Sequence, residues 1–441
     1  MITPLALPER PPFTLRARLL TPLAVGETRY EEDALISVDG AGRLSAIAAS
    51  DGAGGASVVD LRPWVVMPGL VDLHAHLPQL PNAGVGAGLH LLDWLERYIF
   101  PLERAFDEAT AEVVAPAAFR AFARAGTTTL VAYGAIWQPS LDACFRAAEA
   151  HGIRAVIGKV MMDRLSYDTE LEAREVLDLS LRQSAELCER WHGRDEGRLQ
   201  YAFTPRFAVS CTAEMLRESA RLAAATGAYW QTHLSEDRGE IEEVGRLFPE
   251  AIDYTDVYDR AGGLSRRAIL AHAIHLSERE IARVVESGAA VAHCPSSNLF
   301  LASGAMPLAR YLEAGMRLGL GSDVAAGPDV SLFTVMRAGA YTQNGLHAAG
   351  RAATTAMPPP AWLRLGTLGG AEALGLDDRI GSVEVGKEAD LILVDPATTL
   401  PLQGVGASVD DGPDEILSRL IYRSHPDMVR GAWVRGRLLA A

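Results

Sequence analysis

The sequence predicts an α/β protein: a (β/α)8 TIM-type barrel with a small composite β-sandwich domain built from the N- and C-terminal segments. Two observations predict this fold. Short apolar strands alternate with Ala- and Leu-rich helical stretches through the middle of the chain, and both ends have a texture of strands and turns. With 441 residues, the chain is long enough for a barrel of about 250 residues and a second, smaller unit.

The middle of the chain predicts eight strands that alternate strictly with helices, which is the count of a (β/α)8 barrel. The helical stretches at 110–126 and 212–227 each end in a glycine, a common residue at helix C-termini. We expect the barrel to occupy residues 68–380. Its predicted strands lie at 65–76, 126–134, 153–163, 199–207, 228–236, 268–277, 289–298 and 317–326.

The two ends of the chain predict the second unit. Residues 1–67 alternate short apolar runs with Gly-rich turns, and residues 381–441 repeat this texture. Neither end is large enough to bury a core alone, so we expect the two to join into one small sheet domain.

Composition and charge limit the function classes. The chain has 56 acidic residues and 41 Lys and Arg residues, so its net charge is −15, and it contains no basic run. This charge argues against nucleic acids and anionic membranes as partners. No window of 18 apolar residues predicts a membrane span. The four cysteines form no C-x-x-C pair, and prolines and charges interrupt the N-terminus, so the sequence predicts a cytoplasmic protein with free thiols.

Metal-ligand residues stand at the ends of several predicted strands. His74 and His76 end the first strand, and residues i and i+2 of a strand point to the same side. His233, His272 and Asp323 end the fifth, sixth and eighth strands, where barrels of this kind carry their active sites. Each residue alone could be a hydrogen-bonded core histidine or a helix-capping aspartate. Together they favour a site for a metal such as zinc.

These segments resemble a known family. PGLVDLHAH, THLSE, AHAIHLS, AHCPSSN and GLGSDVA are similar to motifs of the amidohydrolase superfamily, and IGSVEVGKEADLILVD and VRGAWVRGRLL resemble its composite β-sandwich domain. The resemblance covers essentially the whole chain. It implies that His74, His76, His233 and Asp323 bind one Zn²⁺, and that His272 contacts the attacking hydroxide or the tetrahedral intermediate. Iron suits the same ligand set.

The expected number of metal ions follows from the fourth strand. Many two-metal members of the superfamily carry a bridging carboxylated lysine there, and the stretch 199–207 contains no lysine. Lys159 lies one strand earlier, where we interpret it as a structural amine. We therefore expect a single metal ion.

Two residues are candidates for proton transfer. Glu236 follows His233 by three residues and could protonate a substrate ring, although acidic residues are also common in the first turn of a helix. The resemblance gives Asp323 a second role, that of accepting the proton of the attacking water.

The segments HAHLPQLPNAG, LLDWLERYIFPLE, GKVMMD, FTPRFAVSC and THLSEDRGEIEEV resemble the guanine deaminases within the superfamily. This resemblance implies hydrolysis of guanine to xanthine and ammonia by attack of metal-bound hydroxide on C2. It makes Gln79 and Arg206 the purine contacts, with Phe207 beside them. Arginine has only donors and suits O6, whereas glutamine offers a donor and an acceptor for the N2/N3 edge. The alternatives are a loop glutamine bound to backbone and an arginine ion pair at the barrel rim.

Other interpretations remain open. The enzyme could act instead on a pterin, an oxidised purine, cytosine or a triazine, and a metal-free interaction protein would share the fold. Related enzymes are often homodimers. In the stretch 91–103 we expect aromatic residues to pack a lid or the core and these acidic residues to be solvated: Asp93, Glu96 and Glu103.

Overall fold

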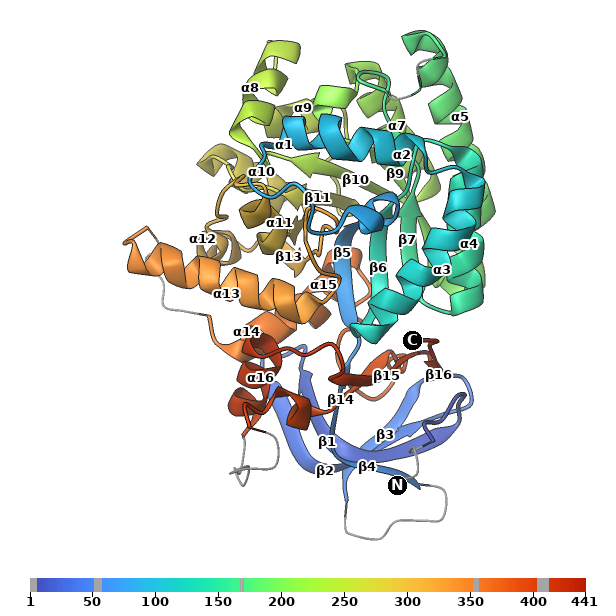
Figure 1. The fold of residues 1–441 in the computed structure, drawn as a ribbon, viewed down its shortest axis with the longest axis vertical. Helices are drawn as coiled ribbons and strands as arrows, with labels where there is room; N and C mark the ends of the chain where they lie inside the picture. Colours follow the sequence, from blue (N-terminus) through green and yellow to red (C-terminus); the bar gives the residue numbers. More distant parts are fainter. Residues whose placement is uncertain (1–5, 51–57, 167, 169, 352–356, 403–411) are drawn as a thin grey trace.

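The computed structural model describes residues 6–50, 58–166, 168, 170–351, 357–402 and 412–441. A barrel of parallel strands surrounded by helices stands on a separate, mostly antiparallel sheet (Figure 1). This arrangement confirms the predicted fold class. None of the described helices combines the length and the apolar character needed to cross a bilayer.

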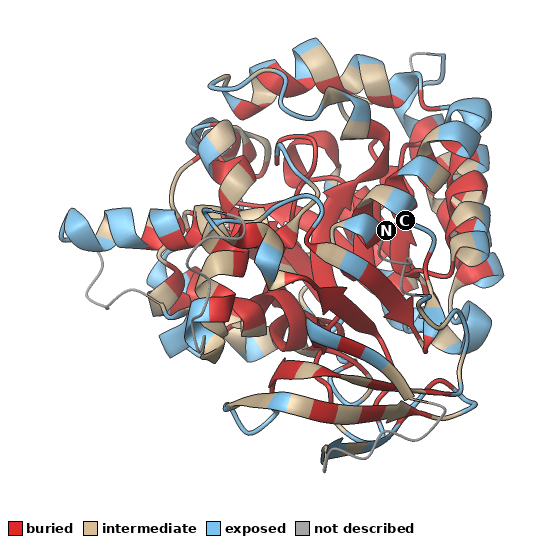
Figure 2. Ribbon diagram, turned by 60° about the horizontal axis from the view of Figure 1, so that its bottom comes forward, coloured by how far each residue is buried: buried red, intermediate tan, exposed pale blue. Residues whose placement is uncertain are grey.

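Eight strands in chain order form the barrel, and each pairs in parallel with its neighbours. All eight predicted strands are present. Nearly all of their residues are buried because helices cover the outside and side chains fill the inside (Figure 2). The strands are β5 (Leu70–His76), β6 (Thr127–Tyr133), β7 (Arg154–Gly158), β9 (Leu199–Pro205), β10 (Tyr229–Leu234), β11 (Ala268–His272), β12 (Ala290–His293) and β13 (Arg317–Leu320), with β8 (Val160–Met161) beside β9.

The helices around the barrel begin and end at residues with known capping chemistry. The hydroxyl of Thr212 accepts a hydrogen bond from the backbone N–H of Met215 at the start of one helix, and Gly227 ends it in the left-handed conformation. The helices are α3 (Glu108–Arg124), α4 (Gln138–His151), α5 (Ala173–Trp191), α6 (Arg194–Gly197), α7 (Ala213–Thr226), α8 (Arg238–Leu247), α9 (Tyr254–Arg260), α10 (Glu278–Ser287), α11 (Pro295–Phe300), α12 (Leu308–Glu313), α13 (Leu332–Ala348), α14 (Pro359–Arg364) and α15 (Gly370–Leu374).

The barrel closes where its first and last strands meet. The backbone N–H of Asp323, just after β13, donates to the carbonyl of His74 on β5 at 2.7 Å. The N–H of His76 donates in turn to the carbonyl of Val324 at 3.1 Å. We call these two hydrogen bonds the closing seam. Three predicted metal-ligand residues therefore lie in the seam itself.

The second sheet contains strands from both ends of the chain, as predicted. In the order β16-β15-β14-β4-β1-β2-β3, the C-terminal strands pair with the N-terminal ones through β14 and β4. The sheet has its own core, which includes Leu15, Leu391 and Trp433. The exact domain boundaries stay predictions. The strands are β1 (Phe13–Pro22), β2 (Thr28–Val38), β3 (Leu44–Ala49), β4 (Val58–Pro68), β14 (Leu391–Val394), β15 (Val429–Val434) and β16 (Arg437–Leu438).

The C-terminal segment also forms a helix, α16 (Pro413–Tyr422), which the strand-and-turn interpretation of that end missed. Proline in the first turn, Asp414 and Glu415 near the positive end of the helix, and buried Ile416 and Leu420 on one side are ordinary helix signals. The helix packs against α13 and α14 of the barrel.

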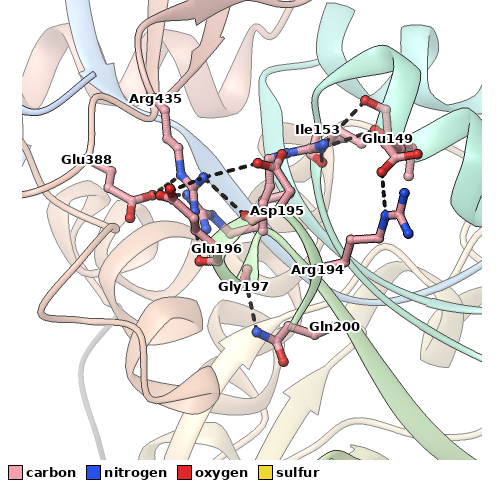
Figure 3. Close-up of polar contacts among 12 residues, drawn as sticks. Glu149, Ile153, Arg194, Asp195, Glu196, Gly197, Gln200, Glu388 and Arg435 are labelled. Carbon is pink, nitrogen blue, oxygen red and sulfur yellow. Dashed lines mark hydrogen bonds and ion pairs between the residues drawn. The ribbon is translucent and has the colours of Figure 1, made fainter. Parts of the chain in front are cut away.

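Buried charges join the barrel to the sheet. Arg154, at the start of β7, donates to Asp390 at 3.0 Å and to Glu388 at 2.5 Å, and all three side chains are at least nine-tenths buried. Figure 3 shows Arg435 reaching Glu388 on one side and the backbone carbonyls of Asp195 and Glu196 on the other. Burial opposes ionisation of Glu388, but the charge of Arg154 and further arginine contacts lower the pKa of this carboxyl to about 2.

We predict that Arg154→Met lowers the free energy of unfolding by about 3–5 kcal/mol, because it leaves two carboxylates buried without their shared partner. Urea unfolding followed by circular dichroism measures the change. The control is Arg246→Met, which removes an arginine whose side chain is 71% exposed in its ion pair with Glu243, and which we expect to leave stability almost unchanged. Equal effects of the two substitutions would contradict a structural role for the buried network.

Candidate active site

Four predicted ligand residues converge at the carboxyl ends of the barrel strands. His74 and His76 project from the same side of β5, His233 comes from β10, and Asp323 follows β13. The Nε2 atom of His76 lies 3.3 Å from the Nε2 atoms of both His74 and His233. Asp323 Oδ1 lies 3.1 Å from His74 Nε2 and 3.2 Å from His76 Nε2.

These spacings fit one small metal ion. In a tetrahedral site with bonds of about 2.0–2.1 Å, neighbouring ligand atoms are about 3.3–3.4 Å apart. The measured separations of 3.1–3.3 Å are close to that edge length. The donor set of three imidazoles and one carboxylate is also one that zinc prefers.

His272 belongs to the same cluster but lies further from the aspartate. Single ligand atoms of His74, His233, His272 and Asp323 all lie within 4.8 Å of one another. His272 Nε2 lies 3.7 Å from Asp323 Oδ2. On the other side of the ring, Nδ1 is 2.9 Å from Asn298 Oδ1, an acceptor, so Nδ1 carries the hydrogen. The Nε2 atom faces the cluster.

Burial prepares the three imidazoles for metal binding. It lowers the pKa of His74, lowers that of His233 well below the usual value, and lowers that of His76 to about 4. The rings are neutral near pH 7, which is the form that binds metals. His233 Nδ1 donates to the backbone carbonyl of Arg206 at 2.6 Å, and this leaves its Nε2 lone pair directed at the other ligands.

The two carboxyl groups of the site have opposite pKa shifts. Burial alone would raise the pKa of Asp323, but contacts with His74 and His76 lower it well below its usual range. Burial and the nearby charges of Asp323, Glu240 and Asp237 raise the pKa of Glu236 well above its usual range. The ionised form is therefore favoured at Asp323 and the protonated form at Glu236, an arrangement suited to acid–base chemistry.

Glu236 points into the site rather than starting a helix. Helix α8 is capped by Asp237, whose side chain accepts from the backbone of Gly239. The Glu236 side chain lies 3.4 Å from His272 Nε2 through Oε2 and accepts from Ser303 Oγ at 3.4 Å through Oε1. The residue at the start of the helix is therefore Asp237 and not Glu236.

The backbone around these groups is strained. The φ angle of His272 is +69° and that of Asp323 is +48°, and Ser235 and Ala273 are also left-handed. Non-glycine residues rarely adopt this conformation, and such residues concentrate at functional sites. These left-handed residues turn the chain sharply at the ends of β10, β11 and β13, next to the side chains of the cluster.

A cavity opens beside the ligand cluster. The short helices α1 (Leu91–Trp94) and α2 (Phe100–Arg104) lie over the end of the barrel opposite the composite sheet (Figure 1). Residues of α1 and of the strand ends line a cavity that all three predicted substrate contacts reach. Its lining residues are His76, Gln79, Leu91, Trp94, Leu95, Arg206, Phe207, His233, Glu236, Leu301, Asp323 and Ala326.

The prediction that Glu103 is solvated is wrong. None of its surface is exposed, because α2 turns this side chain inward under the mouth of the barrel. Its carboxylate accepts hydrogen bonds from Gln79 Nε2 at 2.8 Å and from Arg206 Nη1 at 2.8 and 2.7 Å. The ion pair of Arg206 thus lies at the cavity and not at the rim. Asp93 and Glu96, by contrast, are exposed as expected.

Sequence reasoning also missed Asn298 and Ser303, which hold His272 and Glu236. Asn298 is the last residue of the AHCPSSN motif, but the sequence does not indicate that its partner is His272. For Glu103 the only signal was its place in the stretch 91–103. Trp94 and Phe100 of that stretch pack as expected, one lining the cavity and the other with its ring centroid 5.5 Å from Arg206 Cζ.

Lys159 takes no part in the ligand cluster that the described residues form. Its amine donates to Ser180 Oγ on α5 at 3.0 Å, and burial lowers its pKa to about 7. These contacts agree with its interpretation as a structural amine.

Comparisons with known proteins agree with this geometry. The Amidohydrolase family matches residues 65–439. Guanine deaminase of Mus musculus is 36% identical over 374 residues, 84% of this chain and 82% of the relative. The solved structure of E. coli guanine deaminase is 32% identical, with a TM-score of 0.88 over 97% of this chain and 99% of that one. The guanine deaminase from C. acetobutylicum, solved with guanine bound in its active site, is 27% identical with the same TM-score and coverage. The chain belongs to the amidohydrolase family.

Proposed function

We propose that this protein deaminates guanine hydrolytically to xanthine and ammonia. One observation carries the proposal: one cavity is lined by three members of the ligand cluster, His76, His233 and Asp323, and by the predicted purine contacts Gln79, Arg206 and Phe207. Groups that can bind a metal therefore face groups that can read a purine. The similarity to guanine deaminases supports the same substrate.

We propose that His74, His76, His233 and Asp323 hold one zinc ion. The neutral imidazoles, the ionised carboxylate and the tetrahedral spacing of their atoms support this assignment. Bound there, zinc would lower the pKa of a coordinated water from about 15.7 to about 7 and polarise the reacting carbon. Iron suits the same donors, so metal analysis decides between the two.

The protein groups then divide the proton transfers. N3 of guanine, the ring nitrogen beside C2 that carries no hydrogen, must gain a proton before C2 accepts a nucleophile. Burial and the neighbouring carboxylates raise the pKa of Glu236, which favours its protonated form and suits it to donate a proton to N3. Asp323 accepts the proton of the attacking water, and His272 Nε2, 3.7 Å from Asp323 Oδ2, orients that water. The proton that Asp323 accepted then passes to the C2 amine, which leaves as ammonia, and the C2 hydroxyl gives up its proton to Glu236 as the carbonyl of xanthine forms.

Gln79, Arg206 and Phe207, which also line the cavity, recognise the purine. Arg206 offers only donors and suits the O6 acceptor of guanine, while Gln79 bonds a second polar atom of the base. Phe207 is buried, with its ring centroid 6.4 Å from that of His233, and supplies an apolar contact for the purine ring. A pterin, an oxidised purine, cytosine or a triazine remains the alternative substrate.

We also propose a cytoplasmic location, which the four free cysteines support, since such thiols persist in a reducing compartment. All four are buried. A homodimer stays a prediction.

We predict that His74→Ala removes the metal ion and abolishes turnover while the barrel stays folded, because three donors and strained geometry hold zinc poorly. Elemental analysis, ammonia release and circular dichroism measure the three properties. His347→Ala, at an exposed position on α13, is the control and should retain metal and activity. Stoichiometric zinc and a near-normal rate in His74→Ala would overturn the ligand assignment.

Glu236→Gln should lower kcat by roughly 10²-fold or more, because the amide keeps the shape of the side chain but cannot deliver the proton. Zinc content and KM for guanine should change little. The exposed Glu242→Gln on the following helix serves as the matched control. An unchanged kcat would assign Glu236 to a structural role.

Among free bases, guanine should be preferred over adenine by about 10³-fold or more in kcat/KM, because buried donors reject a base that leaves them unpaired. Adenine also lacks an amine on C2. Cytosine, a pterin and a triazine should be poor substrates. Ammonia release from each base at equal concentration tests this. Efficient turnover of a pterin or triazine without turnover of guanine would replace the proposed substrate and leave the metal site in place.

A further inference from the structure

Two substrate-reading side chains share one buried partner. Gln79 Nε2 and Arg206 Nη1 both donate to Oε1 of Glu103 at 2.8 Å, and Arg206 Nη1 also donates to Oε2 at 2.7 Å. All three side chains are almost completely buried. Two donors that converge on one oxygen must lie next to each other, so the Gln79 amide and the Arg206 guanidinium form neighbouring parts of the cavity wall.

The carboxylate decides which way the Gln79 amide faces. An ionised carboxylate only accepts hydrogen bonds, so it selects the NH₂ end of the amide and places Oε1 at the opposite end. Within the described part of the chain, Oε1 of Gln79 has no hydrogen-bond partner, while Gln79 lines the cavity. The side chain therefore presents an acceptor to the substrate.

Arg206 supplies the complementary group. It lines the same cavity and carries only donors, and the ion pair with Glu103 and the ring of Phe100 hold it in place. An acceptor beside a donor matches a lactam edge, in which N–H stands next to C=O, as at N1 and C6 of guanine. This places Gln79 at the N1/C6 edge of the base and not at the N2/N3 edge that the resemblance implied. An amidine edge, with a bare ring nitrogen beside an amine, as in adenine, faces the same wall with both polarities reversed.

We propose that Glu103 is a positioning residue that sets the specificity of the cavity for bases with a lactam edge, by fixing the polarity of Gln79 and the direction of Arg206. This inference rests on the proposed function for the identity of the substrate. Glu103 itself acts through Gln79 and Arg206 and does not line the cavity.

The test separates recognition from turnover. Hypoxanthine and adenine differ at the N1/C6 edge and share the absence of a C2 amine, so both bind without reaction at C2. Titration calorimetry on the metal-loaded enzyme should show hypoxanthine bound roughly 10²-fold more tightly than adenine. In Glu103→Gln the amide at residue 103 can donate or accept, so the Gln79 amide can flip by 180°. The affinity for hypoxanthine should then exceed that for adenine by less than about tenfold.

Substrates give the matching kinetic measurement. Guanine and 2,6-diaminopurine both carry the C2 amine and differ at the same edge. Glu103→Gln should raise KM for guanine more than it lowers kcat, and should reduce the preference for guanine over 2,6-diaminopurine by about tenfold or more. A merely structural role of Glu103 would lower kcat/KM for both substrates by the same factor. Glu96→Gln, an exposed acidic residue close by in the same stretch, is the matched control and should change neither ratio.

The outcomes are distinguishable. Unchanged binding and kinetic ratios in a folded, metal-loaded Glu103→Gln would overturn the role of Glu103 while guanine turnover still supports the proposed function. A lactam preference that falls in Glu103→Gln, in a protein that releases no ammonia from guanine, would overturn the function and keep the inference. Should Glu103→Gln not fold, Gln79→Leu removes the acceptor alone, and an unchanged hypoxanthine-to-adenine ratio in that variant would overturn the proposal.

Discussion

The closing seam of the barrel is the constraint on which the site depends. The hydrogen bond from Asp323 N–H to the His74 carbonyl joins the last strand to the first, and it brings the carboxylate of one within 3.1 Å of the imidazole of the other. Asp72, buried on β5, strengthens the same junction because its Oδ1 accepts from the N–H groups of His74 and Ser322. Metal binding and barrel closure are thus two results of one set of contacts, and an ion held there would tie the strands further.

Arg206 connects the ligand cluster to the wall of the cavity that Gln79 and Phe207 also line. Its backbone carbonyl accepts from His233 Nδ1 and fixes the ring, while its guanidinium lines the cavity beside Glu103. A shift of Arg206 would therefore move the His233 ring and this wall of the cavity together. Arg206 directly follows β9, a strand that is buried along nearly its whole length, and is itself buried.

Strand-level features could be predicted from the sequence, whereas contacts between elements could not. His74, His76 and the other ligand residues stand at the ends of apolar stretches, and a barrel brings strand ends together whatever the loops do. Glu103 could not be placed, because helical spacing does not say which neighbour a short helix such as α2 will cover. The left-handed backbone at His272 and Asp323 was equally invisible, since these residue types do not demand it and only the tertiary structure imposes it.

The order of elements along the chain has a consequence for synthesis on the ribosome. Strand β4 lies in the composite sheet and β5 in the barrel, with only Gly69 between them. On one side β4 pairs with β1, which precedes it in the chain, whereas its other neighbour, β14, is translated after all eight barrel strands. The barrel can therefore close while one edge of β4 is still unpaired. Until β14 emerges, the N–H and C=O groups of that edge are exposed, which leaves the nascent chain open to chaperones and to aggregation.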